Sequence, residues 1–322
     1  MPDYSQLSLM PDNKASQQAI NNTMSAASQV SLYASRALAI ELNPSFIPSA
    51  LYQELSQVLN QVQSHAKTWL NDLGPKVVQT FPNQIIEITP AFNQAADTMI
   101  ATMEQIRQQQ GEPTQQQRDA LSNQLNGLLG VVEQQVSELD SIQQQLVAFN
   151  ESLEQDQKSL NNSNADIQRY LNDSQTNEKS LKAQIDSINS QISSKQKSLS
   201  YMWLGGPVAI ALIEKEISDL KSKQKKLMAQ YSDVHQQCIQ ITQLQDVFSG
   251  LQMENVNVQE VFSLVLDQGE VVKEKFTAVT DALNQAANED VLIILEQLDL
   301  EVAKSAWNEL DEFVKNLSSQ AH

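Results

Sequence analysis

Apolar residues recur every seven positions along the central part of the chain. Steps of seven from Leu125 to Lys195 meet apolar residues at nine of eleven positions, Ser174 and Lys195 being the exceptions. Steps of seven from Ile213 to Phe248 are apolar at all six positions. Sevenfold repeats of this length are typical of helices that coil around each other. A second, partial stripe accompanies the first: Leu171, Glu178, Ile185, Ile192 and Leu199.

The positions of glycine and proline indicate how long these helices are. Neither residue occurs in the 74 positions from Val131 to Leu204, nor in the 42 from Val208 to Ser249. Because both residues normally end regular elements, we expect uninterrupted helices over about 115–200 and 214–249. At 1.5 Å per residue the first would be about 130 Å long.

Shorter amphipathic segments predict the partners of these two helices. We expect helices over 14–41, 258–287 and 290–317, and a fourth over 49–110 that is interrupted or kinked near Gly74-Pro75, Pro82 and Pro90. With 8 Gly and 9 Pro, the chain has too few turn-forming residues for a sandwich, barrel or doubly wound sheet. The predicted fold is all-α: an elongated antiparallel bundle of five to six long helices.

Charge and cysteine content narrow the possible functions. With 21 basic and 39 acidic residues, the formal charge of −18 argues against a nucleic-acid partner, which needs a basic face. The single cysteine, Cys238, excludes an internal disulfide and a Cys-based zinc site, and we expect it to be a small buried residue. We expect no catalytic residues, no metal site and no cofactor. The three histidines are scattered, and we expect Trp69 and Trp307 to pack in the bundle core.

One uncharged apolar segment interrupts the pattern between the two long helices. It lies at the turn of an antiparallel pair, hence at the tip of a rod, where polar residues are the usual choice. An exposed apolar tip requires a partner, either protein or lipid. The opposing interpretation is that the segment folds back and packs on its neighbouring helices. We name the segment the head: Tyr201, Met202, Trp203, Leu204, Gly205, Gly206, Pro207, Val208, Ala209, Ile210, Ala211, Leu212 and Ile213.

Basic residues flank the head. Residues 195–226 contain seven lysines and only three acidic residues, Glu214, Glu216 and Asp219, which gives this segment a net charge of +4. Lysines near an anionic lipid surface favour binding, and Tyr201 and Trp203 are residue types enriched at membrane interfaces. We therefore predict a head region over 196–215 on a tail bundle made of 1–195 and 216–322. We name the lysines the collar: Lys195, Lys197, Lys215, Lys221, Lys223, Lys225 and Lys226.

The order of elements, together with one motif, resembles a known family. The stretch from Ser64 to Val78 contains Ala66, then Trp69-Leu70, then Pro75-Lys76-Val77. This arrangement is similar to the helical pore-forming toxins of the cytolysin A superfamily, particularly components related to haemolysin BL and the non-haemolytic enterotoxin. The resemblance implies a tail bundle with an apolar head between its two longest helices. It also implies that the head enters a target membrane and that the protein assembles with copies and partner components.

The short head favours one component of a multi-part toxin over an independent pore former. Thirteen residues cannot span a hydrocarbon core of about 30 Å as one helix, so either the head enters one leaflet or the adjoining helix ends also insert. Met1–Asn13 shows no basic segment followed by an apolar one, so we expect secretion without a classical signal peptide. The alternative is an intracellular coiled-coil scaffold whose tip docks a protein partner.

Overall fold

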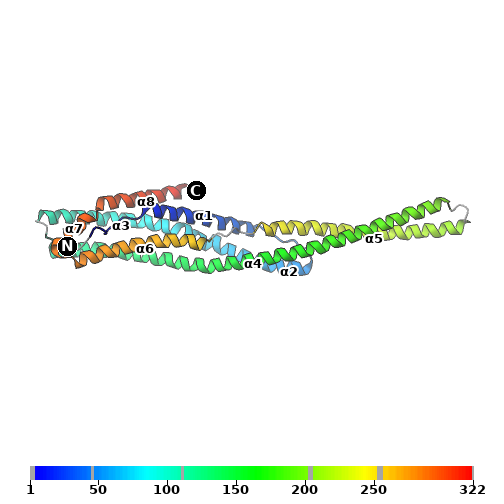
Figure 1. Ribbon diagram of the computed structural model, residues 1–322, viewed down its shortest axis with the longest axis horizontal. Helices are drawn as coiled ribbons and strands as arrows, with labels where there is room; N and C mark the ends of the chain where they lie inside the picture. The colour runs from blue at the N-terminus through cyan, green and yellow to red at the C-terminus, as the bar shows by residue number, and fades with distance from the viewer. Residues whose placement is uncertain (1–3, 45–46, 110–111, 202–205, 252–256, 321–322) are drawn as a thin grey trace. The chain divides into compact units, whose positions relative to one another are not determined.

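The computed structural model describes residues 4–44, 47–109, 112–201, 206–251 and 257–320, but not the side chains of 199–201, 206–211 and 318–320. Every regular element in this part of the chain is helical, which confirms the all-α prediction (Figure 1). The elements are α1 (Asn13–Leu38), α2 (Ser49–Thr68), the π-helical turn η1 (Trp69–Leu73), α3 (Gly74–Gln108), α4 (Gln115–Tyr201), α5 (Gly206–Ser249), α6 (Val258–Gln285), α7 (Asn288–Gln297) and α8 (Leu300–Gln320).

The first long helix has the predicted length, whereas the second begins at Gly206, eight residues before the predicted start at 214. Helix α4 runs for 87 residues and α5 for 44. Most apolar positions of the sevenfold stripes are buried, among them Leu139, Leu160, Ile167 and Ile241, each at most 1% exposed, while Ile185, Leu220 and Val234 are half-buried. The periodic pattern therefore predicted the buried face of both helices correctly.

Two expectations about helix interruptions were wrong. Helix α3 continues through Pro82 and Pro90 without an interruption, while a kink at either proline stays a prediction. The predicted single helix over 290–317 is instead split at Asp299, whose φ of 41° lies in the left-handed region. Leu295 and Leu300, 1% and 4% exposed, would point to different sides of one straight helix. The break at Asp299 allows both leucines to be buried.

The interruption near Gly74-Pro75 takes the form of the π-helical turn η1. Pro75 has no backbone N–H, so an α-helical hydrogen bond to the carbonyl of Asn71 cannot form. The Gly74 N–H instead donates to the carbonyl of Trp69, five residues earlier. The sequence thus continues as helix from α2 into α3 with one wider turn.

The chain divides into two compact units, which we describe separately. Unit 1 comprises 1–38, 64–154 and 254–322, and unit 2 comprises 39–63 and 155–253. In unit 1, α3 packs against α8, α1 and α7, while α1 also packs against α6. The ring of Phe92 lies 5.7 Å from that of Trp307 and 6.1 Å from that of Phe276. Trp307 is 3% exposed and donates to the Leu9 carbonyl, so its predicted core position is confirmed.

Trp69 anchors the π-helical turn in unit 1. Its side chain is fully buried, and its ring stacks on that of Phe149 with 5.1 Å between the centroids. The indole Nε1–H donates to the Ser31 hydroxyl at 2.9 Å. These contacts tie η1 to both α1 and α4, and they confirm the predicted core role of Trp69.

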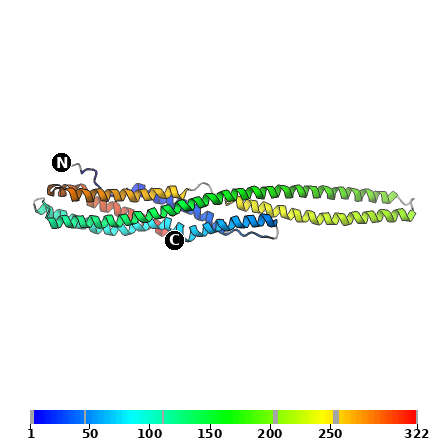
Figure 2. The same ribbon diagram turned by 90° about the horizontal axis from the view of Figure 1, so that it is seen from below.

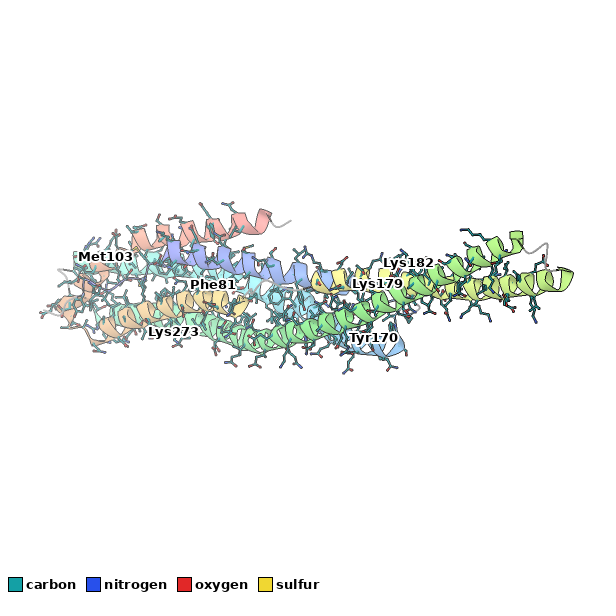
Figure 3. The ribbon with its side chains drawn as sticks, turned by 45° about the vertical axis from the view of Figure 1, so that its right-hand side comes forward. Phe81, Met103, Tyr170, Lys179, Lys182 and Lys273 are labelled. Atoms are coloured by element: carbon teal, nitrogen blue, oxygen red, sulfur yellow. The ribbon has the colours of Figure 1, made fainter. Side chains whose placement is uncertain are left out.

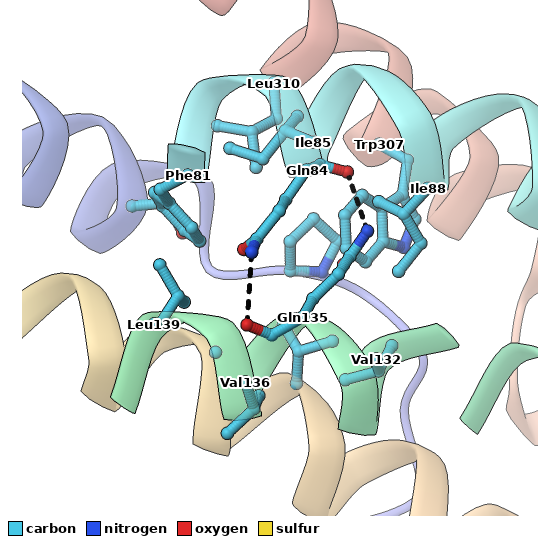
Figure 4. A pocket seen from close by; sticks show the side chains of 14 residues that line it. Phe81, Gln84, Ile85, Ile88, Val132, Gln135, Val136, Leu139, Trp307 and Leu310 are labelled. Atoms are coloured by element: carbon cyan, nitrogen blue, oxygen red, sulfur yellow. Dashed lines mark hydrogen bonds between the residues drawn. The ribbon is translucent and has the colours of Figure 1, made fainter. Parts of the chain in front are cut away.

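A small apolar cavity lies between α3, α4, α6 and α8 in unit 1 (Figure 4). Across it, Gln84 Nε2 donates to the carbonyl of Gln135, and Gln135 Nε2 donates to the carbonyl of Gln84. These reciprocal bonds satisfy polar groups that would be costly to bury unpaired. The cavity volume of about 30 Å³ is room for roughly two water molecules, so it is too small for an organic ligand.

In unit 2, the second part of α4 pairs with α5 in an antiparallel arrangement (Figures 1 and 2). Apolar side chains from both helices form its core, including Leu181, Ile188, Ile192 and Leu227. Four side-chain pairs join the two helices in nearly the same register. As the residue number decreases along α4, the number of its partner on α5 increases by the same amount or nearly so. The pairs are Lys195 with Glu216, Asn189 with Gln224, Glu178 with His235, and Gln168 with Gln245.

Candidate functional site

The predicted head lies at the turn between α4 and α5. Within it, Tyr201 ends α4 and Gly206 begins α5, while Met202–Gly205 lie outside the described residues. The backbone of 206–213 is helical, and Pro207 lies in the first turn, where its missing N–H costs no hydrogen bond. The second half of the head is thus the beginning of α5.

The structure describes two head side chains, those of Leu212 and Ile213. Leu212 is 59% exposed, whereas Ile213 is 8% exposed and lies on the buried stripe of α5. The side chains of Tyr201 and of 206–211 lie outside the description. The proposed membrane role of the head therefore stays a prediction, as does the division into head 196–215 and tail.

The collar lysines lie on the surface of the α4–α5 pair. Six of the seven are exposed, and Lys195 is half-buried. Lys195 Nζ pairs with the Glu216 carboxylate at 2.6 Å, a contact across the two helices. The lysines of α5 lie on several sides of the helix because their spacing does not follow one face. The collar is thus a belt of charge around the pair.

Charge is unequally divided between the two units. The sequence of unit 1 contains 10 basic and 27 acidic residues, or −17, and that of unit 2 contains 11 and 12, or −1. Nearly all of the net negative charge therefore belongs to unit 1. Unit 2, which carries the head and the collar, is nearly neutral.

A polar cluster in the α4–α5 pair was not predicted. Glu178 of α4 accepts a hydrogen bond from His235 Nδ1 of α5 at 2.8 Å, and the His235 ring stacks on Tyr231. The bond from His235, followed by bonds from Tyr231 and Cys238, lowers the pKa of Glu178 below its ordinary value. Partial burial and the neighbouring Glu178 raise the pKa of Tyr231.

Cys238 is 7% exposed, as predicted for a small buried residue, and burial raises the pKa of its thiol. The three histidines were treated as scattered, and His235 was not connected with Glu178. The signal for the cluster was nevertheless present, since Tyr231, His235 and Cys238 share one face of α5 and Glu178 interrupts the second apolar stripe of α4. A search for matching interruptions on the two helices would have found it.

A polar hollow in unit 1 lies where α4 begins and α6 ends. Its volume is about 420 Å³, and Arg118 forms part of its wall. The Arg118 guanidinium donates to the carbonyls of Leu283 and Ala286 and to the Asn288 side chain. Arg118 therefore caps the end of α6. Within the described residues, no group of three His, Cys, Asp or Glu side chains is placed to hold a metal ion, and no helix has the length and hydropathy of a membrane span.

Solved structures with the same fold are components of bacterial toxins. The AhlB pore of the tripartite α-pore-forming toxin AHL from Aeromonas hydrophila has 13% identity and a TM-score of 0.65, covering 96% of this chain and 97% of that chain. The SmhB pore of the tripartite toxin Smh from Serratia marcescens has 12% identity and a TM-score of 0.66, covering 95% and 99%. The Bacillus cereus HblL1 toxin component has 15% identity and a TM-score of 0.61, covering 96% of each chain.

The fold is therefore that of α-pore-forming toxin components. The chain belongs to the Bacillus haemolytic enterotoxin (HBL) family, whose model matches residues 12–195, more than half of its length. No curated protein matches the chain. The family match includes the Trp69 motif and confirms the resemblance found in the sequence. It does not favour the alternative of an intracellular scaffold.

Proposed function

We propose that the chain is one component of a multi-part α-helical pore-forming toxin, and that it binds the target membrane through the head and the collar. Membership of the haemolytic enterotoxin family is the observation that carries this proposal. The protein is secreted, reaches the membrane from water, and acts by assembly into a pore and not by catalysis.

The tip of the α4–α5 pair supports the membrane role on physical grounds. The head contains no charged residue, and Leu212 at its end is 59% exposed. Burying apolar area in lipid yields about 25 cal/mol per Å², so a head of this composition has a substantial driving force to leave water. Its length restricts it to one leaflet unless the adjoining ends of α4 and α5 also insert.

The collar supplies the initial attraction. Each lysine close to an anionic membrane contributes roughly 1 kcal/mol, and the collar exceeds its neighbouring acidic residues by four charges. Because unit 1 carries −17, the protein approaches an anionic surface most favourably with unit 2 foremost. The collar thus orients the head toward the bilayer.

Assembly is the remaining part of the proposal. AhlB and SmhB are each described as the pore of a tripartite toxin. By analogy, this chain associates with copies of itself and with partner components on the target membrane.

Flotation with liposomes tests the role of the head. The wild type is compared with Leu204→Asp and Ile210→Asp, on vesicles of phosphatidylcholine with and without phosphatidylserine. Leu264→Asp is the matched control, because Leu264 of α6 is 44% exposed and lies in unit 1. We expect the wild type and the control to float and both head variants to stay in the soluble fraction. Equal flotation of all four proteins would exclude a membrane role for the head.

A further inference from the structure

The apolar core of the α4–α5 pair has a polar interruption. On α4, Ser174 and Glu178 occupy successive positions of the two apolar stripes, between Leu171 and Leu181. Glu178 points toward α5, where His235 binds its carboxylate at 2.8 Å. We call the residues Ser174, Glu178, Tyr231, His235 and Cys238 the polar layer.

The carboxylate in the polar layer is well satisfied in this register alone. Its side chain is 20% exposed, and its hydrogen-bond partners all lie on α5 at spacings of four and three residues. Sliding the helices by one heptad in either direction would put Met228 or Thr242 in the place of His235 and remove the basic partner of this partly buried carboxylate. A polar residue at such a position fixes register at a cost in stability.

The polar layer separates two apolar blocks that differ in packing. The proximal block includes Leu160, Ile167, Ile241 and Phe248, all 0% exposed. The proximal block also includes Leu171 and Leu244 at 6% and 8%, whereas in the distal block Leu181, Ile192, Ile213 and Leu227 are each 8% exposed, Ile188 is 4% exposed, and Ile185, Leu220 and Val234 are only partly buried. Side chains of the distal block are therefore less completely enclosed.

A third segment accounts for the difference. Glu54 of α2 forms a hydrogen bond with Asp166 of α4, and this bond raises the pKa of Glu54. Ile40 and Leu42 share a hollow with Leu244 and Val247 of α5. Residues 39–63 thus cover the proximal block. The cross-helix contacts that the structure gives for the distal block come from α4 and α5 alone. Because most helical stability comes from tertiary packing, a pair of helices without further cover is held less firmly than one covered by a third segment.

We propose that the polar layer is the boundary of a separately opening segment, residues 179–234, that carries the head and the collar. Tyr231 packs against the distal block, but Ser174, Glu178 and His235 contribute little apolar contact between the blocks, so opening of the distal block does not require the proximal block to open. Its use rests on the proposed function: the opening segment is the part of α4 and α5 that can follow the head to the membrane. The proximal block stays paired and keeps the register fixed by Glu178.

Amide hydrogen exchange of the full chain in solution, without lipid, tests this boundary. We expect amides of 181–192 and 217–230 to exchange at least tenfold faster than those of 160–171 and 241–248, with the change falling at the polar layer. A single rate for both blocks would overturn the proposal. Since no membrane is present, this result is independent of whether the head binds lipid.

Variants that join the two blocks give the sharper test. Glu178→Leu continues the second apolar stripe through the layer, and Ser174→Leu continues the first while leaving the carboxylate and its partners in place. Each should slow exchange of the distal block at least threefold. Asp186→Leu is the matched control, because Asp186 is exposed on α4 and the change removes the same charge and adds the same side chain. Distal exchange that is unchanged in both variants, or slowed equally by the control, would contradict a boundary at this layer.

Discussion

Replacement of Gly74 by alanine tests the account of the π-helical turn. A Cβ atom at this position would lie 2.9 Å from the Trp69 carbonyl oxygen, 3.0 Å from Trp69 Nε1 and 3.1 Å from Trp69 Cε2. The indole cannot retreat, because it stacks on Phe149 and donates to Ser31. The helix must therefore shift, and overpacking of this kind costs about 1–3 kcal/mol.

The assay is thermal unfolding followed by circular dichroism and tryptophan fluorescence. A unit of roughly 200 residues loses about 2–4 °C in Tm for each kcal/mol, so Gly74→Ala should lower the Tm by about 2–12 °C. Gly127→Ala and Gly130→Ala are the controls, because no atom outside the helix backbone lies within 4 Å of a Cβ at either position. Each should gain up to about 1 kcal/mol from helix propensity. A Tm for Gly74→Ala as high as that of the controls would refute the close approach of Gly74 to Trp69.

Three further predictions concern the Trp69 contact, the collar and the polar layer. Trp69→Phe should lower the free energy of unfolding, measured with guanidinium, by about 1–2 kcal/mol. The decrease should be smaller in a Ser31→Ala background, because the hydrogen bond between Trp69 and Ser31 is already absent there. Glu178→Gln should be less stable than the wild type at pH 7. Folding lowers the pKa of Glu178, so the ionised carboxylate stabilises the fold at pH values above the ordinary pKa of about 4.5. This stabilisation, and with it the difference between the two proteins, should be lost as the pH falls below 4.5 and through the lowered pKa. An unchanged difference at pH 3.5 would contradict this. Neutralising four collar lysines should weaken binding to phosphatidylserine vesicles by up to roughly 4 kcal/mol at low salt. The control is the double variant Lys179→Gln with Lys182→Gln, on the exposed face of α4 (Figure 3), which should bind these vesicles as the wild type does. The four are Lys221, Lys223, Lys225 and Lys226.

Long helices were predictable from the sequence because their signals are local and redundant. The absence of Gly and Pro over 131–204 and the sevenfold repeat both specify α4, and either alone would have indicated it. Breaks within helices were less predictable, because they depend on tertiary contacts. The left-handed residue Asp299 serves the burial of leucines on both sides of it. Pro82 and Pro90 remain within α3, so a proline alone did not decide where this helix ended.

The candidate site was predictable in part. The head and the collar stand out in composition against an acidic, polar chain, but α5 begins at Gly206, eight residues before the start predicted from the sequence, so part of the head is helical. The polar layer was not predicted from the sequence. Its recognition requires the register between α4 and α5, and the residue pattern of a single helix does not contain that information. Only the pairing of Glu178 with His235 shows that the interruption is matched on both sides.

Red-cell lysis is the most direct test of the central claim, that this chain is a toxin component acting through its head. The wild type and Ile210→Asp are each assayed alone and with the products of the neighbouring genes. The account predicts lysis by the wild type together with its partners, and none when Ile210→Asp takes its place. Equal lysis by Ile210→Asp, or the absence of lysis in every combination, would contradict it.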